Sequence, residues 1–170
     1  INCGCPVPKI VKTGAGSALT RDPDRLFKIT KAVVDAAEGT PVTVKIRSGW
    51  EQKMMTWKEA AQAALDAGVS GITIHPRTRA QGYEGFSDWN IMKELVDFVN
   101  KKVPVFGSGD LFKPEDAIKM IEQTNVDGVM FARGAMGNPF IFKDTTSLLT
   151  IGKYEPVPIE IRIKTGFAEL

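Results

Sequence analysis

The sequence predicts an α/β fold: the C-terminal part of a (β/α)8 barrel, with about five βα units, followed by a linker and the start of a further helix. Short apolar runs alternate with amphipathic segments along the chain. The runs are almost continuously apolar, as in parallel strands that are buried on both faces. Polar or glycine-rich residues follow nearly every run, at the strand ends where a barrel assembles its site. A doubly wound sheet is the alternative, but the glycine motif typical of its first turn is missing.

Five strands are expected along the chain, most of them rich in β-branched residues. The first ends at Ile1, and the others cover residues 42–46, 71–75, 103–107 and 128–132. Because a closed barrel needs eight strands, five leave two open edges. The chain is therefore expected to be a fragment that lacks the N-terminal barrel strands, or to self-associate through its sheet edges.

Helix-start signals mark the segments between the strands. Asp22-Pro23 begins the first helix, which ends at Gly39. Thr56 and Glu59 have the spacing of a capping box, which predicts the start of the second helix. The other three helices are expected to begin at Ser87 or Asp88, at Pro114 and at Asn138-Pro139. Residues 1–150 then form the barrel domain, and residues 151–170 form a proline-containing linker and the start of one more helix.

Composition narrows the class of protein. The chain has 170 residues, of which 43% are hydrophobic and 25% charged, and its formal net charge is +2. These values suit a globular domain and give no indication of a DNA or membrane partner. The two cysteines, Cys3 and Cys5, are too close for an ordinary disulfide, which favours a reduced, cytoplasmic setting. With His75 as the single histidine, they cannot complete a structural zinc site, so no metal is expected.

Cys5 lies between Gly4 and Pro6, where the chain turns sharply after the first strand, and Asn2 precedes it by three residues. A thiol at such a turn can do chemistry, although a small buried side chain is the ordinary role of cysteine. A cysteine-protease pair is disfavoured, because only His75 could serve as the base and no orienting group is identifiable. A thiol that donates a proton needs no histidine.

Glycine-containing loops follow the last two strands and hold Ser108-Gly109 and Ala132-Arg133. In barrels, such loops often bind a phosphate through backbone N–H groups, and an arginine adds forked donors. Tight turns without a ligand are the alternative.

Four side chains at or after the middle strands are candidates for ligand binding: Lys45, His75, Arg77 and Tyr83. Lys45 and Arg47 alternate to the same face of their strand, so both can point into the barrel mouth. The alternative for Lys45 is a side chain that reaches out to solvent. His75 ends the next strand and is either a binding residue or a structural one. Tyr83, in a glycine-flanked loop, either lines a substrate channel or packs on the surface.

Five ordered motifs span residues 2–142: NCGCPVPKIVKTGAGSAL, VTVKIRSGW, ITIHPRTRAQGYEGFSDW, GSGDLF and ARGAMGNPFIF. In this order they resemble the flavin-dependent tRNA-dihydrouridine synthases. The resemblance implies a (β/α)8 barrel that carries FMN, followed by a helical domain that helps to hold tRNA. It also implies reduction of uridine to 5,6-dihydrouridine in tRNA, with NADPH regenerating the reduced flavin.

The resemblance also implies roles for individual residues. Cys5 matches the catalytic cysteine, which protonates C5 of the uracil while the flavin delivers a hydride to C6. Asn2 assists in the substrate site, and Arg77 lies near the substrate opening. The matches to FMN-binding positions are Lys45 and His75 at the flavin ring, and Ser108, Gly109, Ala132 and Arg133 at its phosphate. The sequence departs from the family pattern at four positions: Cys3 replaces an apolar residue, Pro76 a glycine, Ser108 an asparagine and Ala132 a glycine. Pro76 removes a backbone donor.

Two other functions stay open from the sequence. The first is another FMN- or phosphate-binding barrel oxidoreductase that acts on a small metabolite and needs no tRNA surface. The second is a non-catalytic RNA-binding module, which leaves the strand-end positions of Lys45, His75 and Arg133 unexplained.

Overall fold

A parallel sheet of five strands, in the order β1-β2-β5-β6-β7, runs through the centre of the computed structural model, which describes residues 1–168. The strands are β1 (Asn2–Cys3), β2 (Thr43–Arg47), β5 (Gly71–His75), β6 (Val105–Ser108) and β7 (Gly128–Met130). Each strand pairs in parallel with the one before it in this series. Such an order is the one that consecutive βα units of a barrel produce.

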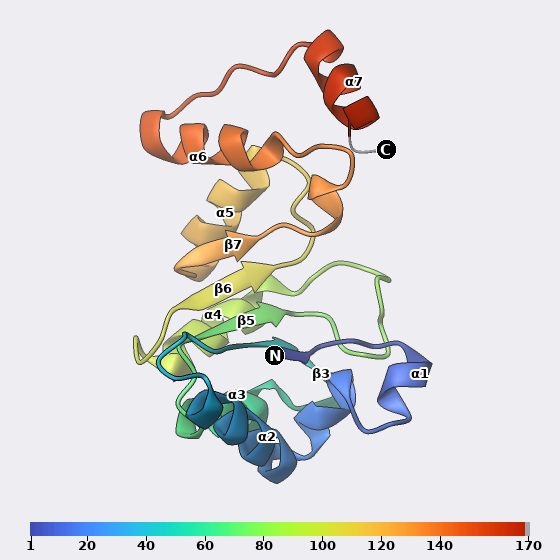
Figure 1. The fold of residues 1–170 in the computed structure, drawn as a ribbon, viewed down its shortest axis with the longest axis vertical. Coiled ribbons are helices and arrows are strands. Elements are labelled where there is room, and N and C mark those ends of the chain that lie inside the picture. Colours follow the sequence, from blue (N-terminus) through green and yellow to red (C-terminus); the bar gives the residue numbers. More distant parts are fainter. Residues whose placement is uncertain (169–170) are drawn as a thin grey trace.

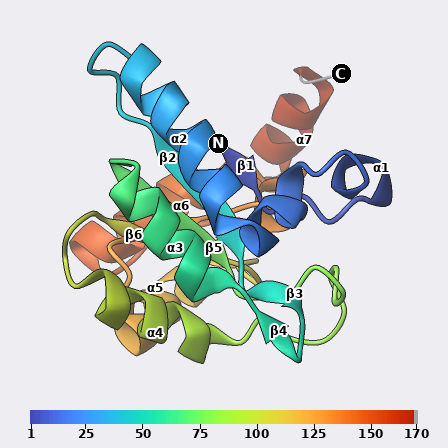
Figure 2. The ribbon, with the colours of Figure 1, turned by 90° about the horizontal axis from the view of Figure 1, so that it is seen from below.

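Helices connect the strands and pack against one another in chain order. They are α2 (Pro23–Ala36), α3 (Trp57–Asp66), α4 (Trp89–Val99), α5 (Pro114–Thr124) and α6 (Ile141–Ile151). Figures 1 and 2 show α2, α3, α4 and α5 as a row that follows the order of the strands. The opposite ends of the sheet, β1 and β7, are edges among the described residues.

The alternation of side chains along the strands separates the core from the site. Four β-branched residues, each at most 1% exposed, lie under the helices: Val44, Ile46, Ile72 and Ile74. The residues between them point to the other face. There, Lys45 is in register with Thr73, and Arg47 is in register with His75. The sequence expectation that Lys45 and Arg47 share one face is confirmed.

Most predicted bounds agree with the structure to within three residues. Strand β5 has the predicted bounds, whereas β1 covers Asn2–Cys3, beyond Ile1, at which the first strand was predicted to end. Helix α2 begins after Asp22, whose side chain accepts a hydrogen bond from the Arg25 backbone (3.0 Å), but it ends three residues before Gly39. Helix α6 begins two residues after the predicted Asn138-Pro139 start, at Ile141.

The predicted capping box at Thr56 and Glu59 is wrong. Helix α3 does begin after Thr56, but the Thr56 side chain makes no capping bond. Its hydroxyl donates instead to the hydroxyl of Thr20 (2.8 Å), which is 36 positions away in the sequence. A buried partner from another element therefore replaces the local one.

Several short elements were not predicted. They are a hairpin of β3 (Gly49–Glu51) and β4 (Met54–Met55), the single-turn helix α1 (Pro8–Val11), and the 3-10 helices η1 (Gly16–Arg21) and η2 (Arg133–Ala135). All of them lie in connections that follow strands. They therefore shape the loops that surround the carboxyl ends of the sheet.

The final helix, α7 (Ile159–Ala168), follows an extended segment after α6, as Figure 1 shows. The expected helix over residues 159–170 is confirmed up to Ala168, and its last two residues lie outside the described part. No helix within residues 1–168 is long and apolar enough to cross a membrane.

Candidate functional site

The carboxyl ends of all five strands border a cavity of about 380 Å³. Nine of the ten sequence-predicted site residues line it: Asn2, Cys5, Lys45, His75, Tyr83, Ser108, Gly109, Ala132 and Arg133. The tenth, Arg77, lines a neighbouring cavity, and its guanidinium lies 3.3 Å from the His75 ring nitrogen. Residues from five separate strand-end loops are thus brought together, as expected for a barrel mouth.

The Cys5 turn is held from both sides. The Asn2 side chain accepts a hydrogen bond from the Gly4 backbone N–H (3.0 Å), and the Ser17 backbone N–H donates to the Cys5 carbonyl (3.0 Å). Gly16 has φ +60°, and a Cβ there would lie 2.7 Å from the Cys5 carbonyl oxygen. Only glycine satisfies both conditions, so the second glycine of the loop allows the chain to fold closely over the Cys5 turn.

The two cysteines have opposite environments. Cys3 is 1% exposed in the core, and burial raises the pKa of its thiol to about 11. It is therefore a neutral core side chain. Cys5 is partly exposed and lines the cavity. The geometry distinguishes the two thiols in the same direction as the sequence analysis.

Lys45 brings an unpaired cation to the cavity. Its side chain is half-buried, and it forms no ion pair or hydrogen bond with any residue from 1 to 168. Burial, followed by the charge of Arg47, lowers the pKa of Lys45. A desolvated ammonium without an acceptor is costly, and an anionic ligand would offset that cost.

Arg47 ties three segments together, a role that the sequence analysis did not assign. It is 3% exposed, and its guanidinium donates to the carbonyls of Gly4 (2.9 Å), Thr78 (2.9 Å) and Gly82 (3.0 Å). The Cys5 turn and the loop that carries Tyr83 are therefore fastened to the same side chain. The sequence signal that could have indicated this role is that Arg47 and Lys45 point to the same face of β2.

His75 is 8% exposed at the end of β5. Burial lowers its pKa to about 3, and the charges of Arg47, Lys45 and Arg77 add to this effect against that of Asp110. The ring is therefore neutral at physiological pH. Because it lines the cavity as a neutral imidazole, it can donate or accept a hydrogen bond there.

Arg77 is buried (2% exposed) and its guanidinium is fully engaged. It donates to the carbonyls of Glu84 (3.1 Å) and Gly85 and to the Ser87 hydroxyl (3.0 Å). It also pairs with both carboxylate oxygens of Asp110, at 2.9 Å each. Its contacts organise the loop before α4 beneath the site.

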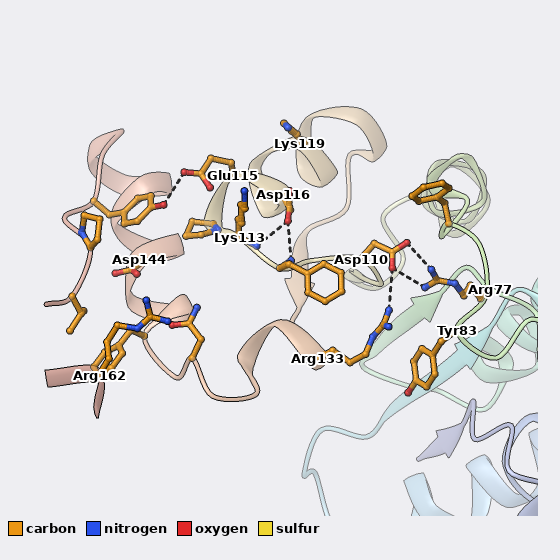
Figure 3. Close-up of a pocket in the computed structure, with 18 of the residues that line it drawn as sticks. Arg77, Tyr83, Asp110, Lys113, Glu115, Asp116, Lys119, Arg133, Asp144 and Arg162 are labelled. Carbon is orange, nitrogen blue, oxygen red and sulfur yellow. Dashed lines mark hydrogen bonds and ion pairs between the residues drawn. The ribbon is translucent and has the colours of Figure 1, made fainter. Parts of the chain in front are cut away.

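Asp110 joins this network to the last strand-end loop, and it is a second residue that the sequence analysis did not assign. It stands between Arg77 and Arg133 in Figure 3, with Arg133 3.3 Å from its carboxylate. Burial opposes its ionisation, but hydrogen bonds from Ser87 and Arg77 outweigh burial and hold its pKa below the ordinary value. The residue type of Asp110 does not by itself predict this role, because its partners Arg77 and Arg133 come from other loops.

The predicted phosphate loops lie at the ends of β6 and β7. Ser108 is 3% exposed. Gly109 has φ +122°, and a Cβ there would lie 2.8 Å from the His75 ring. The Arg133 guanidinium lies 4.5 Å from the centre of the Tyr83 ring. A glycine thus lets the first loop approach His75, and an exposed arginine borders the second.

A second, larger cavity of about 1130 Å³ extends from Tyr83, Asp110 and Arg133 towards the end of the chain. Figure 3 shows Lys113, Asp144 and Arg162 on its far side. It shares Tyr83, Asp110, Phe112 and Arg133 with the smaller cavity, so the two cavities are neighbours.

The residues present fit FMN. Lys45 and Arg47 bring two cations to the smaller cavity, and among the lining residues Asp110 is the single carboxylate, with both oxygens already paired. This charge balance suits an anionic ligand. Lys45 and His75 would hold the flavin ring, and the loops at Gly109 and Arg133 would hold its phosphate. No group of three or more His, Cys, Asp or Glu side chains within residues 1–168 is arranged to hold a metal ion.

Comparisons with known proteins show which family the sequence matches. The sequence model of the family described as dihydrouridine synthase (Dus) matches residues 1–169. A probable tRNA-dihydrouridine synthase of Treponema pallidum is 57% identical over 100% of this chain and 52% of its own. The tRNA-dihydrouridine synthase B of Pseudomonas putida is 39% identical over 93% of this chain and 46% of its own. The chain therefore spans about half the length of the curated relatives it matches.

Solved structures show the same fold at low sequence identity. DHODH of Eimeria tenella, crystallised with ferulenol, has a TM-score of 0.60 at 17% identity and covers 91% of this chain and 50% of its own. A putative lactate oxidase of Pediococcus acidilactici has a TM-score of 0.51 at 20% identity, over 74% of this chain and 34% of its own. Both are (β/α)8 barrels. The predicted fold, part of such a barrel, is confirmed.

Proposed function

Because the chain belongs to the dihydrouridine synthase family, we propose that the protein containing it reduces uridine to 5,6-dihydrouridine in tRNA, with FMN as cofactor and NADPH as reductant. One observation carries the proposal. A partly exposed thiol, an unpaired lysine and a neutral histidine line one cavity at the strand ends of a barrel of this family. A module that only binds RNA needs no such convergence of reactive groups.

Cys5 is the proton donor in this proposal. When bound, FMN supplies the hydride that adds to C6 of the uracil ring. The Cys5 thiol gives its proton to C5, and the resulting thiolate takes a proton back from water after turnover. Arg47 fixes the Gly4 carbonyl next to the thiol, and Gly16 allows the chain to close over it. Asn2 keeps the turn in shape through the Gly4 N–H.

Lys45 and His75 have complementary roles at the cofactor. The Lys45 ammonium would stabilise negative charge on the bound flavin, and its partial burial would strengthen that interaction. His75, neutral in its buried position, orients the ring by a hydrogen bond. Ser108, Gly109, Ala132 and Arg133 hold the phosphate.

Tyr83 and Arg77 act on the substrate side. Tyr83 is 60% exposed in the loop that Arg47 and Arg77 anchor, so its ring is available to a base that has left its stack. Arg77 is a positioning residue, because its donors are occupied by the protein.

The remaining features follow from this function. Residues 1–150 belong to the catalytic barrel, and residues 151–170 begin a helical tRNA-binding domain after α6. The enzyme is cytoplasmic, where tRNA and reduced thiols are found. The 170-residue chain on its own pairs through the edges β1 and β7.

The test measures flavin and product together. The purified protein is expected to be yellow, to oxidise NADPH, and to form dihydrouridine in tRNA that lacks this modification. A colourless protein that forms no dihydrouridine would contradict the proposal. Equal activity on a free nucleobase would favour the alternative, a barrel oxidoreductase for small metabolites.

A further inference from the structure

Arg21 and Arg79 bring two guanidinium groups to one side chain, the indole of Trp50. Their central carbons lie 4.4 Å and 4.5 Å from the centre of the ring. The three residues come from η1, from β3 and from the loop after β5. We call them the Arg21–Trp50–Arg79 stack.

The stack is built into the fold and does not depend on chance side-chain positions. Strand β3 packs against η1, which carries Arg21. The backbone of Arg79 donates to the Gly49 carbonyl (2.8 Å), and that of Ala80 donates to the Trp50 carbonyl (2.9 Å). Two backbone hydrogen bonds therefore hold the loop with Arg79 against the hairpin that carries Trp50.

Neither guanidinium has an acidic partner. Within residues 1–168, no ion pair includes Arg21 or Arg79, and the adjacent Glu51 pairs with neither. The Nε of Arg79 is buried without an acceptor. Two contacts with one ring keep the cations no more than about 9 Å apart, close to the Debye length of about 8 Å at physiological salt. Two cations held this close without an ion-pair partner raise the positive potential around the indole, which favours an anion.

The stack is connected along the chain to two segments at the strand-end cavity. Arg47 fastens the Thr78 and Gly82 carbonyls, which flank Arg79 in the sequence. The helix that ends at Arg21 begins at Gly16, against the Cys5 turn. The segments that carry the two arginines therefore continue directly into segments that are held at the cavity.

We propose that the Arg21–Trp50–Arg79 stack binds a phosphodiester group of the RNA strand that flanks the target uridine. The inference rests on the proposed function and adds a contact site to it. Guanidinium forks match phosphate oxygens, and the indole holds both cations in place by cation–π attraction. With the ring covered by guanidinium groups, the stack reads the RNA backbone and not its bases.

The experiment measures the salt dependence of tRNA binding by the FMN-loaded holoenzyme. Affinity is followed by fluorescence anisotropy of labelled tRNA between about 50 and 200 mM KCl. Arg79→Ala or Arg21→Gln is expected to weaken binding about fivefold and to reduce the slope of log K against log salt by roughly 0.7 to 0.9. Arg21→Gln with Arg79→Ala is expected to reduce the slope by about twice that amount. Trp50→Leu is expected to weaken binding while the slope falls less, since both charges remain.

Two controls make the result decisive. Lys28→Ala removes an exposed, unpaired cation from α2, away from the stack, and is expected to leave the slope unchanged. NADPH-driven flavin reduction is expected to be equal in all variants, which shows that the barrel is intact. Arg21 is exposed, so Arg21→Gln is expected to fold normally. The salt dependence of tRNA binding can therefore be measured with this variant even if Arg79→Ala impairs folding.

The outcomes separate this inference from the proposed function. An unaltered enzyme that forms dihydrouridine, with Arg21→Gln and Lys28→Ala showing the same slope and affinity as the parent, would overturn the stack as an RNA site and leave the function standing. An unaltered enzyme that binds no tRNA and forms no dihydrouridine would overturn the function itself.

Discussion

The Arg77 guanidinium and the Asp110 carboxylate form a two-oxygen ion pair beneath the site, with both contacts at 2.9 Å. Arg77 is 2% exposed, so the pair is the main compensation for a buried charge. The same Asp110 accepts from the Ser87 backbone (2.8 Å) and from Arg133. One carboxylate therefore connects the loop after β5, the start of α4 and the loop after β7.

Asp110→Asn is expected to lower the free energy of unfolding by about 2 to 3 kcal/mol, because Arg77 then remains buried without its counter-ion. Arg133→Ala removes only the exposed partner of Asp110 and is expected to cost less than about 1 kcal/mol. Urea unfolding of both variants measures the difference. Equal losses of unfolding free energy in the two variants would show that the buried Arg77–Asp110 pair contributes no more to stability than the exposed contact with Arg133.

Cys5→Ala is expected to reduce dihydrouridine formation by at least about 100-fold, the range for loss of a general acid, while flavin absorbance is retained. Cys3→Ala shortens a core side chain and is expected to lower stability by about 1 kcal/mol without a comparable loss of rate. Single-turnover oxidation of the reduced flavin by tRNA measures the rate. A larger loss of rate in Cys3→Ala would assign the proton donor to the other thiol.

His75 gives stability a defined pH dependence. Its pKa is about 3 in the folded chain and about 6.5 when unfolded, so protons bind the unfolded chain more readily between these values. The stability that neutral His75 contributes is full above pH about 6.5 and is lost as pH falls towards 3. The free energy of unfolding is expected to drop by about 2 kcal/mol between pH 7 and pH 5. His75→Gln should flatten this part of the profile; an unchanged profile would mean that another group titrates there.

Gly16→Ala is expected to displace the Cys5 turn. The new Cβ would be 2.7 Å from the Cys5 carbonyl oxygen, in a backbone with φ +60°. Gly39→Ala is the matched control, because its φ is +86° and a Cβ there meets nothing within 4 Å. Gly39→Ala should cost only the backbone strain, about 1 kcal/mol, and leave dihydrouridine formation unchanged. Gly16→Ala should cost more and slow dihydrouridine formation; equal effects would show that the contact with Cys5 is unimportant.

The alternating pattern was sufficient to predict the sheet and most of its helices. Strand β5 was predicted to the residue because three consecutive β-branched residues stand between Gly71 and His75. The hairpin of β3 and β4 was missed because its strands have three and two residues and its turn lacks glycine. Strands of that length depend on tertiary contacts and leave no periodic signal.

Among the site residues, those marked by a local sequence pattern were predicted, and those defined by distant partners were not. Lys45 and His75 were found because they interrupt or end apolar strands. Asp110 was not, since its importance comes from Arg77 and Ser87, which are 33 and 23 positions away. The Thr56 capping box failed for the same reason, because the hydroxyl of Thr20 competes for its side chain. Sequence spacing predicts local bonds, but partners far along the chain are known only once it has folded.

The three carbonyls that Arg47 binds have a mechanical consequence. Gly4 belongs to the turn with the proposed acid, and Thr78 and Gly82 bracket the loop that leads to Tyr83. Under the proposed function, a displacement of the tyrosine loop by an incoming base would be transmitted through the Arg47 guanidinium plane to the Cys5 turn. In the proposed enzyme, Arg47 would thereby couple entry of the substrate to the position of the Cys5 thiol.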